Sequence, residues 1–219
     1  MHSFDTILRQ HATILLLDAA SASVRAGWVR RDQAPRWISI NSEASSGIYA
    51  ALTELDVSPN AADAFVFCEG PGSILGIRTV ATALRTWVAL HPRLVYSYRS
   101  LELVATAHGS PDLTAICDAR RQSWHATGVE PDGSLRALQR VPTGDLPSSD
   151  LITPAGFRQW SATPQPPPSI VPYEPQRLTG DLSALPLFRE APEPDAFLHE
   201  NPSFVQWTPA VHRAPNTSA

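Results

Sequence analysis

The strongest chemical signal in the sequence is a glycine turn, Gly70-Pro71-Gly72-Ser73, between a predicted strand and a predicted helix. Glycines in such a turn let backbone N–H groups approach an anion at the start of the helix, where the helix dipole adds positive charge. One interpretation is a phosphate cleft, and the other is a tight turn in which Ser73 only caps the helix. Because ligands gather beyond the carboxyl ends of strands in an open sheet, the cleft residues would be Asp18, Gly70, Gly72, Ser73 and Asp118.

A second acidic residue, Asp118, also ends an apolar run and is followed by Ala119, Arg120 and Arg121. A carboxylate in that position can hold a hydrated magnesium ion near a nucleotide. The alternative is a solvated turn with pairs of opposite charges, and this second interpretation is preferred.

Several classes of catalytic chemistry lack the residues they need. All 17 Lys and Arg positions are Arg, which excludes a Walker-type phosphate loop, a Schiff-base mechanism and a Ser-Lys dyad. The seven histidines form neither His-x-x-x-His nor His-Glu-x-x-His, so no metal site is predicted. A hydrolytic triad built on Ser73 lacks the Gly-x-Ser-x-Gly pattern. Cys68 and Cys117 each close an apolar run and are expected to be buried as small hydrophobes.

Composition limits the partners and the compartment. The chain has 219 residues, 43% of them hydrophobic, and a net charge of −4. It can fill a core, but it offers no broad basic surface for holding a nucleic acid tightly on its own. No signal peptide and no apolar run of membrane-spanning length is visible, so we expect a cytoplasmic protein without a membrane contact.

Hydrophobic patterning predicts a first lobe over residues 1–111. Residues 1–11 are expected to be a loose leader, and Asn41 or Ser42 is expected to cap the first helix. Ser73 is expected to cap the second helix, whose apolar residues recur at helical spacing from Ile77 to Val88. The predicted strands cover residues 13–18, 23–29, 36–40, 64–68 and 94–96, and the predicted helices follow residues 41, 73 and 100.

The chain is predicted to begin a second lobe over residues 112–219. A strand over residues 113–118 ends in an acid, as the first strand does, and a hairpin partner follows over 124–129. Proline is dense from Pro164 onwards, so this lobe is expected to be reduced, rich in loops and free of long helices. An ordered stretch is expected over 197–207 and a disordered tail from about Arg213.

One face of the second predicted helix is suited to a partner. It carries Thr79, Ala83 and Thr86, which are small and uncharged, and such a face permits close packing against another helix. Plain exposure to solvent is the alternative, and the sequence leaves both open.

Taken together, these segments resemble the TsaB family, also called YeaZ or glycoprotease-like. The resemblance is good over residues 13–127 and thin beyond. Its strongest part is Gly70-Pro71-Gly72-Ser73-x-x-Gly76-x-Arg78, followed by a long apolar helix. The other matching segments are residues 16–21, 41–43, 100–102, 118–121 and, more weakly, 193–198.

The resemblance implies an α/β fold of the actin-like ATPase or ribonuclease-H-like type, with two lobes. It also implies a non-catalytic scaffold for tRNA threonylcarbamoyladenosine formation. The implied partners are a TsaD-type transferase, in a heterodimer, and a TsaE-type ATPase, with tRNA reached only through the complex. The family pairs through its first two helices, which makes the expected interface Ile48, Leu52, Leu75, Arg78, Thr79, Thr82, Ala83 and Thr86.

The sequence departs from the family pattern around the cleft. Ala19 and Ala20 replace Thr and Ser after Asp18, and Ile74-Leu75 replaces Phe-Thr after Ser73. No catalytic residue and no cofactor of its own are therefore expected, although ATP or ADP at the partner interface stays open. The rival functions are a nucleotide-dependent ATPase or kinase of the actin-like fold and a glycoprotease-like hydrolase. Whether the protein alone is a homodimer is also left open.

Overall fold

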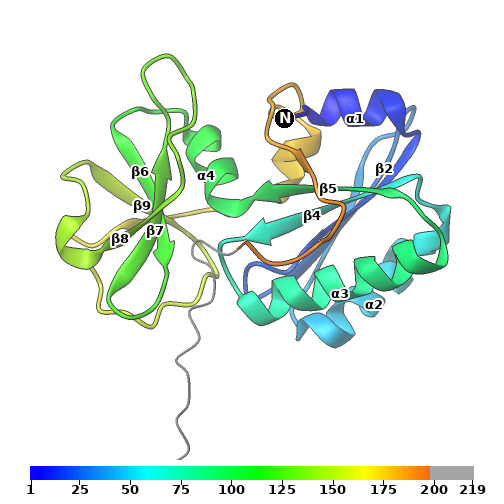
Figure 1. Ribbon diagram of the computed structural model, residues 1–219, viewed down its shortest axis with the longest axis horizontal. Helices are drawn as coiled ribbons and strands as arrows, with labels where there is room; N and C mark the ends of the chain where they lie inside the picture. Colours follow the sequence, from blue (N-terminus) through cyan, green and yellow to red (C-terminus); the bar gives the residue numbers. More distant parts are fainter. Residues whose placement is uncertain (198–219) are drawn as a thin grey trace, which may run out of the picture.

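A computed structural model describes residues 1–197 as two β-sheets joined side by side (Figure 1). The larger sheet has the strand order β11-β5-β4-β1-β2-β3, in which β1, β4 and β5 are parallel and the others antiparallel. The α/β architecture predicted from the sequence is therefore confirmed. The strands are β1 Thr13–Asp18, β2 Val24–Arg30, β3 Arg36–Ile40, β4 Ala64–Gly70, β5 Leu94–Arg99 and β11 Arg189–Glu190.

The larger sheet is covered on both faces. Figure 1 shows α2 and α3 together on one face and α1 on the other. The central strands are buried on both sides, which explains why β1 and β4 are continuous apolar runs instead of alternating ones. The helices are α1 Phe4–Gln10, α2 Ala44–Leu55, α3 Ile74–Leu90 and α4 Ser100–His108, with short 3-10 turns at Pro59–Ala61, Thr143–Asp145 and Pro175–Thr179.

The smaller sheet has the order β10-β9-β6-β7-β8. Within the described residues it has no α-helix inserted between its own strands, in keeping with the proline-rich sequence. Helix α4 packs against it from the first lobe and lies between the two sheets (Figure 1). Its strands are β6 Leu113–Asp118, β7 Ser123–Gly128, β8 Gln139–Pro142, β9 Asp150–Pro154 and β10 Ser169–Val171.

The N-terminal residues differ from their expected state. Residues 4–10 form α1, and the hydroxyl of Ser3 accepts a hydrogen bond from the Thr6 N–H. Phe4 and Ile7 are at most 1% exposed, because they close the face of the sheet that α2 and α3 leave open. The expectation of a loose leader was wrong, because two buried side chains three positions apart hold this short helix on the sheet.

The C-terminal part of the described chain also returns to the first sheet. Strand β11 pairs with β5, and the backbone of Phe188 exchanges hydrogen bonds with His2. The expected boundary at residue 111 separates the two sheets, but residues after about 173 pack with the first lobe and not with the second. The expected cap of α2 differs as well, since Glu43 occupies that position and makes no side-chain cap bond. The stretch expected to be ordered over 197–207 and the tail expected to be disordered from Arg213 lie outside the described residues, apart from Phe197.

A buried hydrogen-bond cluster joins these parts. Asp18, at the end of β1, is fully buried and accepts hydrogen bonds from the hydroxyls of Tyr98 and Tyr173. The Tyr173 hydroxyl oxygen lies 2.5 Å from Asp18 Oδ2. Burial and the adjacent Asp18 carboxyl raise the pKa of both tyrosines well above the usual range, so both keep their protons and donate. Because Tyr173 follows β10, this contact fastens the exit from the second sheet to the centre of the first.

The Tyr173→Phe variant should test this connection. Removing one donor leaves a buried carboxyl oxygen short of a partner, so the free energy of unfolding should fall by about 2 kcal/mol. Urea denaturation at neutral pH measures the change. The matched control is Tyr49→Phe, because Tyr49 is 61% exposed and should lose almost nothing. Equal stability of the two variants would contradict the assigned role.

Candidate functional site

At the glycine turn Gly70-Pro71-Gly72-Ser73, the backbone of the chain itself occupies the space where an anion would bind. The Ser73 N–H, at the start of α3, donates to the carbonyl oxygen of Ala20 at 2.7 Å. A Cβ added at Gly72 would lie 2.4 Å from that same oxygen, and one at Gly76 would lie 2.2 Å from the carbonyl oxygen of Ala19. The glycines therefore allow the connection between β1 and β2 to pack on the helix start. Of the two interpretations, the structure supports the tight turn, with Ser73 also accepting from the Gly76 N–H.

The expected phosphate cleft is brought together only in part. Gly72, Ser73 and Asp118 line one cavity of about 410 Å³ between the two lobes. Asp18 does not reach it, because its carboxyl group is buried against the two tyrosines and the Ala20 N–H. Gly70 is buried and does not line that cavity. The expectation that Asp18 faces a ligand was therefore wrong.

The Gly76→Ala variant should show how tightly the turn is packed. The added methyl group would collide with backbone that cannot move without disturbing β1, so unfolding should become easier by roughly 3 kcal/mol. Thermal and urea unfolding measure this. Gly144→Ala is the matched control, since its Cβ would meet nothing within 4 Å. A neutral Gly76→Ala variant would show that the close approach does not constrain the fold.

Asp118 holds two loops of the second lobe together. Its oxygens accept from the backbone N–H groups of Arg120, Trp160 and Ser161 and from the Ser161 hydroxyl, at 3.0 Å for the hydroxyl. These four donors match the roughly four acceptor positions of a carboxylate, so little capacity is left for a metal ion. Asp118 thus fits neither the magnesium site nor the solvated turn. Within residues 1–197, no three His, Cys, Asp or Glu side chains gather as a metal site would require.

The protonation of Asp118 follows from these donors. Burial would raise the pKa of its carboxyl, but the N–H groups of Ser161, Trp160 and Arg120 outweigh burial and lower the pKa below its ordinary value. A carboxyl with a depressed pKa in the folded state stabilises the fold at pH values above its ordinary pKa. That contribution is lost as the pH falls through the depressed value.

The Asp118→Asn variant should lower the free energy of unfolding by about 2 kcal/mol at pH 7, because one amide oxygen cannot accept from all the donors. The deficit should begin to shrink as the pH falls below about 4, where the unfolded wild-type chain takes up a proton, and should shrink further as the pH falls through the depressed pKa of the folded carboxyl. Urea denaturation at pH 7 and pH 3 measures both values. Asp112→Asn is the control, as Asp112 is exposed and its side chain makes no hydrogen bond within the described residues. An unchanged deficit at both pH values would contradict a role for the charge.

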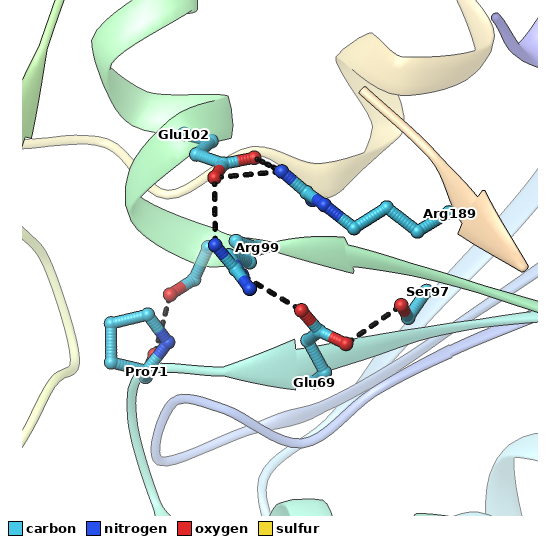
Figure 2. Close-up of polar contacts among 7 residues, drawn as sticks. Glu69, Pro71, Ser97, Arg99, Glu102 and Arg189 are labelled. Atoms are coloured by element: carbon cyan, nitrogen blue, oxygen red, sulfur yellow. Dashed lines mark hydrogen bonds and ion pairs between the residues drawn. The ribbon is translucent and has the colours of Figure 1, made fainter. Parts of the chain in front are cut away.

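An ion-pair network lies at the carboxyl ends of β4 and β5 (Figure 2). Glu102, with only 4% of its side chain exposed, accepts from Arg189 at 2.8 Å and from Arg99 at 3.3 Å. Arg99 also donates to Glu69 at 2.8 Å, so two carboxylates and two guanidiniums alternate. The network fastens β11 to α4, and next to it the Ser100 hydroxyl donates to the Pro71 carbonyl of the glycine turn. Sequence reasoning recorded Glu102 only as part of a motif. The signal that could have revealed the role of Glu102 is an acidic residue within an otherwise apolar helix.

A shallow groove of about 400 Å³ separates α2 from α3. It gathers most of the expected interface residues. Leu52 is the exception, because it packs in the core and does not line the groove, so its expected place in the interface was wrong. Ile48 lines the groove although only 1% of it is exposed. Tyr49, which was not expected, lines the groove and is 61% exposed. The expected residues that line it are Ile48, Leu75, Arg78, Thr79, Thr82, Ala83 and Thr86.

The groove is more apolar than its threonines suggest. The hydroxyl of Thr79 donates to the Leu75 carbonyl at 2.8 Å, and that of Thr86 donates to the Thr82 carbonyl at 2.9 Å. Both hydroxyls are thus satisfied within α3. Leu75 is 78% exposed at the helix start, which is unusual for so large an apolar side chain.

Comparison with known proteins agrees with this fold. A family model described as TsaD, tRNA N6-adenosine threonylcarbamoyltransferase, matches residues 42–134, which include α2, α3 and the glycine turn. A Pseudomonas aeruginosa structure described as similar to the peptidase YeaZ is 18% identical with a TM-score of 0.60, over 86% of this chain and 100% of its own. The structure of YeaZ from the same organism is also 18% identical, with a TM-score of 0.56, over 85% and 99%.

The chain is YeaZ-like in its fold. This confirms the resemblance found in the motifs, and with it the two-lobed fold of the TsaD type. No curated protein matches the sequence. In the described part of the chain, every helix is too short or too polar to cross a bilayer.

Proposed function

We propose that this YeaZ-like chain is a non-catalytic partner of a TsaD-type threonylcarbamoyltransferase in tRNA threonylcarbamoyladenosine formation. The observation that carries the proposal is the groove between α2 and α3. It is largely apolar and open, it places Ala83 and three threonines beside Tyr49, Leu75 and Trp87, and it lies within the segment that matches the TsaD family model. A homologous helix pair could pack into such a groove closely.

The condition of the interlobe cavity supports a non-catalytic role. The Ser73 N–H at the start of α3 is already bonded to the Ala20 carbonyl, and the Gly76 N–H donates to the Ser73 hydroxyl, so fewer backbone donors are left for an anion. The two acids that an ATPase or kinase could use, Asp18 and Asp118, have their oxygens committed to protein donors. A glycoprotease-like hydrolase would need a nucleophile and base, and Ser73 is a helix cap. In this proposal, ATP or ADP would bind at the partner interface, and a TsaE-type ATPase would join the assembled pair.

The Ala83→Glu variant tests the docking face. Ala83 lines the groove at partial exposure, and Glu is a good helix former, so the fold should persist while a charge is forced into an apolar contact. Affinity for the TsaD-type protein of the same genome should fall roughly thirtyfold, which corresponds to about 2 kcal/mol. Isothermal titration calorimetry with the two purified proteins measures it.

The matched control is Ala137→Glu, the same change at an exposed position of the second lobe outside the groove. It should leave the affinity unchanged. Nucleoside analysis of cellular tRNA gives the functional readout, and Ala83→Glu should lower threonylcarbamoyladenosine. If the two wild-type proteins do not associate, and deletion of this chain leaves that nucleoside unchanged, the proposed function is wrong.

A further inference from the structure

The second-lobe wall of the interlobe cavity carries an aromatic and cationic surface. Trp160 is 65% exposed, which is high for the largest side chain, and it lines the cavity together with Arg120 and Arg158. The Arg120 guanidinium carbon lies 5.6 Å from the centre of the Trp160 ring. Asp118 fixes this arrangement, because it binds the backbone N–H groups of both Arg120 and Trp160. The backbone of Arg120 and that of Trp160 are thus fixed relative to each other by one carboxylate.

Among the described residues, two arginines at this surface have no ion-pair partner, although the whole chain is acidic. Two carboxylates line the same cavity, and both are occupied: Glu69 binds Ser97 and Arg99, and Asp118 binds its backbone donors. Within residues 1–197, by contrast, Arg120 and Arg158 have no carboxylate at ion-pair distance. Two guanidiniums and an indole are therefore available to a ligand.

The backbone beneath Arg120 is strained. Arg120, Arg121 and Gln122 have φ values of 63°, 53° and 55°, the left-handed region that costs non-glycine residues about 1–2 kcal/mol each. The turn persists because Ser123 donates to the Arg120 carbonyl at 2.7 Å and the Thr143 N–H donates to the Gln122 carbonyl at 2.9 Å. Glycine would make the same turn without this cost. The strained turn exposes arginine side chains, which glycine would not provide. Backbone strain of this kind is common at ligand-binding sites.

We propose that this surface binds single-stranded RNA, with one base stacked on Trp160 and neighbouring phosphates paired to Arg120 and Arg158. Aromatic faces beside arginines bind unpaired nucleotides in this way. An isolated mononucleotide fits less well, because the Ser73 N–H is already bonded to the Ala20 carbonyl and the indole lies open to solvent. The choice of RNA rests on the proposed function, whereas the site itself does not. Leu75 lines both this cavity and the α2–α3 groove, so RNA bound here would lie beside a docked partner.

The test measures binding of a fluorescein-labelled ten-nucleotide oligouridine to the purified chain by fluorescence anisotropy. At 50 mM salt, the dissociation constant should be on the order of 100 µM, weak enough to require the complex in the cell. Trp160→Ala should weaken binding at least about fivefold, and Trp160→Phe should restore most of it because a stacking ring remains. Arg120→Asn keeps a residue that tolerates left-handed backbone and should reduce the salt slope by about 0.7.

The control is Arg36→Gln, the loss of an exposed arginine on β3 at the far edge of the first sheet, which should leave binding unchanged. Circular dichroism and thermal unfolding confirm that each variant is folded. The proposal is overturned if folded Trp160→Ala binds oligouridine like wild type, or if AMP at equal nucleotide concentration displaces the RNA. Because the assay contains no partner protein, its outcome is separate from the Ala83→Glu pairing test.

Discussion

The connection between β1 and β2 lies directly on the first turn of α3, and several other contacts depend on this approach. The carbonyl oxygens of Ala19 and Ala20 sit where side chains on Gly76 and Gly72 would have to be. The same connection folds the Ala20 N–H back onto Asp18, which in turn receives the hydroxyls of two tyrosines. One short loop thereby sets the position of α3, the end of β5 and the segment that leaves the second sheet.

This arrangement has opposite consequences for the two sides of α3. On the side of the cavity, the Ser73 N–H at the helix start is bonded to the Ala20 carbonyl, and the acids nearby serve the fold. On the side of α2, the helix keeps a groove in which threonine hydroxyls are satisfied by their own backbone and an exposed leucine stands at the rim. A helix held this rigidly from behind suits docking, because little ordering of the groove remains to be done on binding.

Sequence patterns predicted the elements whose signals are local. The buried runs of β1, β4 and β6 and the apolar stripe of α3 are visible in one window of residues, and the structure has them. Strand β11 has two residues and is defined only by its pairing with β5, so no local pattern could reveal it. The role of Asp18 was missed for the same reason: its partner Tyr173 lies 155 positions away. Of the interface, exposed positions on α3 were predictable from helical period, while Leu52 was misplaced because a shift of one residue, about 100° around the helix, decides between core and rim.

The second lobe was expected to be reduced and rich in loops, and its structure holds one surface in a defined arrangement. Its sheet relies on α4 from the first lobe, and its loops are fastened by Asp118 and by Tyr173, which both lie at the carboxyl ends of its parallel strands. What these fastenings hold in place is the wall with Trp160 and Arg120, facing the start of α3. A lobe kept only as a remnant would have no need for a strained turn that presents arginines. Because Leu75 lines both the groove and the cavity, a partner docked on α3 would lie next to the surface with Trp160 and Arg120. It could then contact the same ligand.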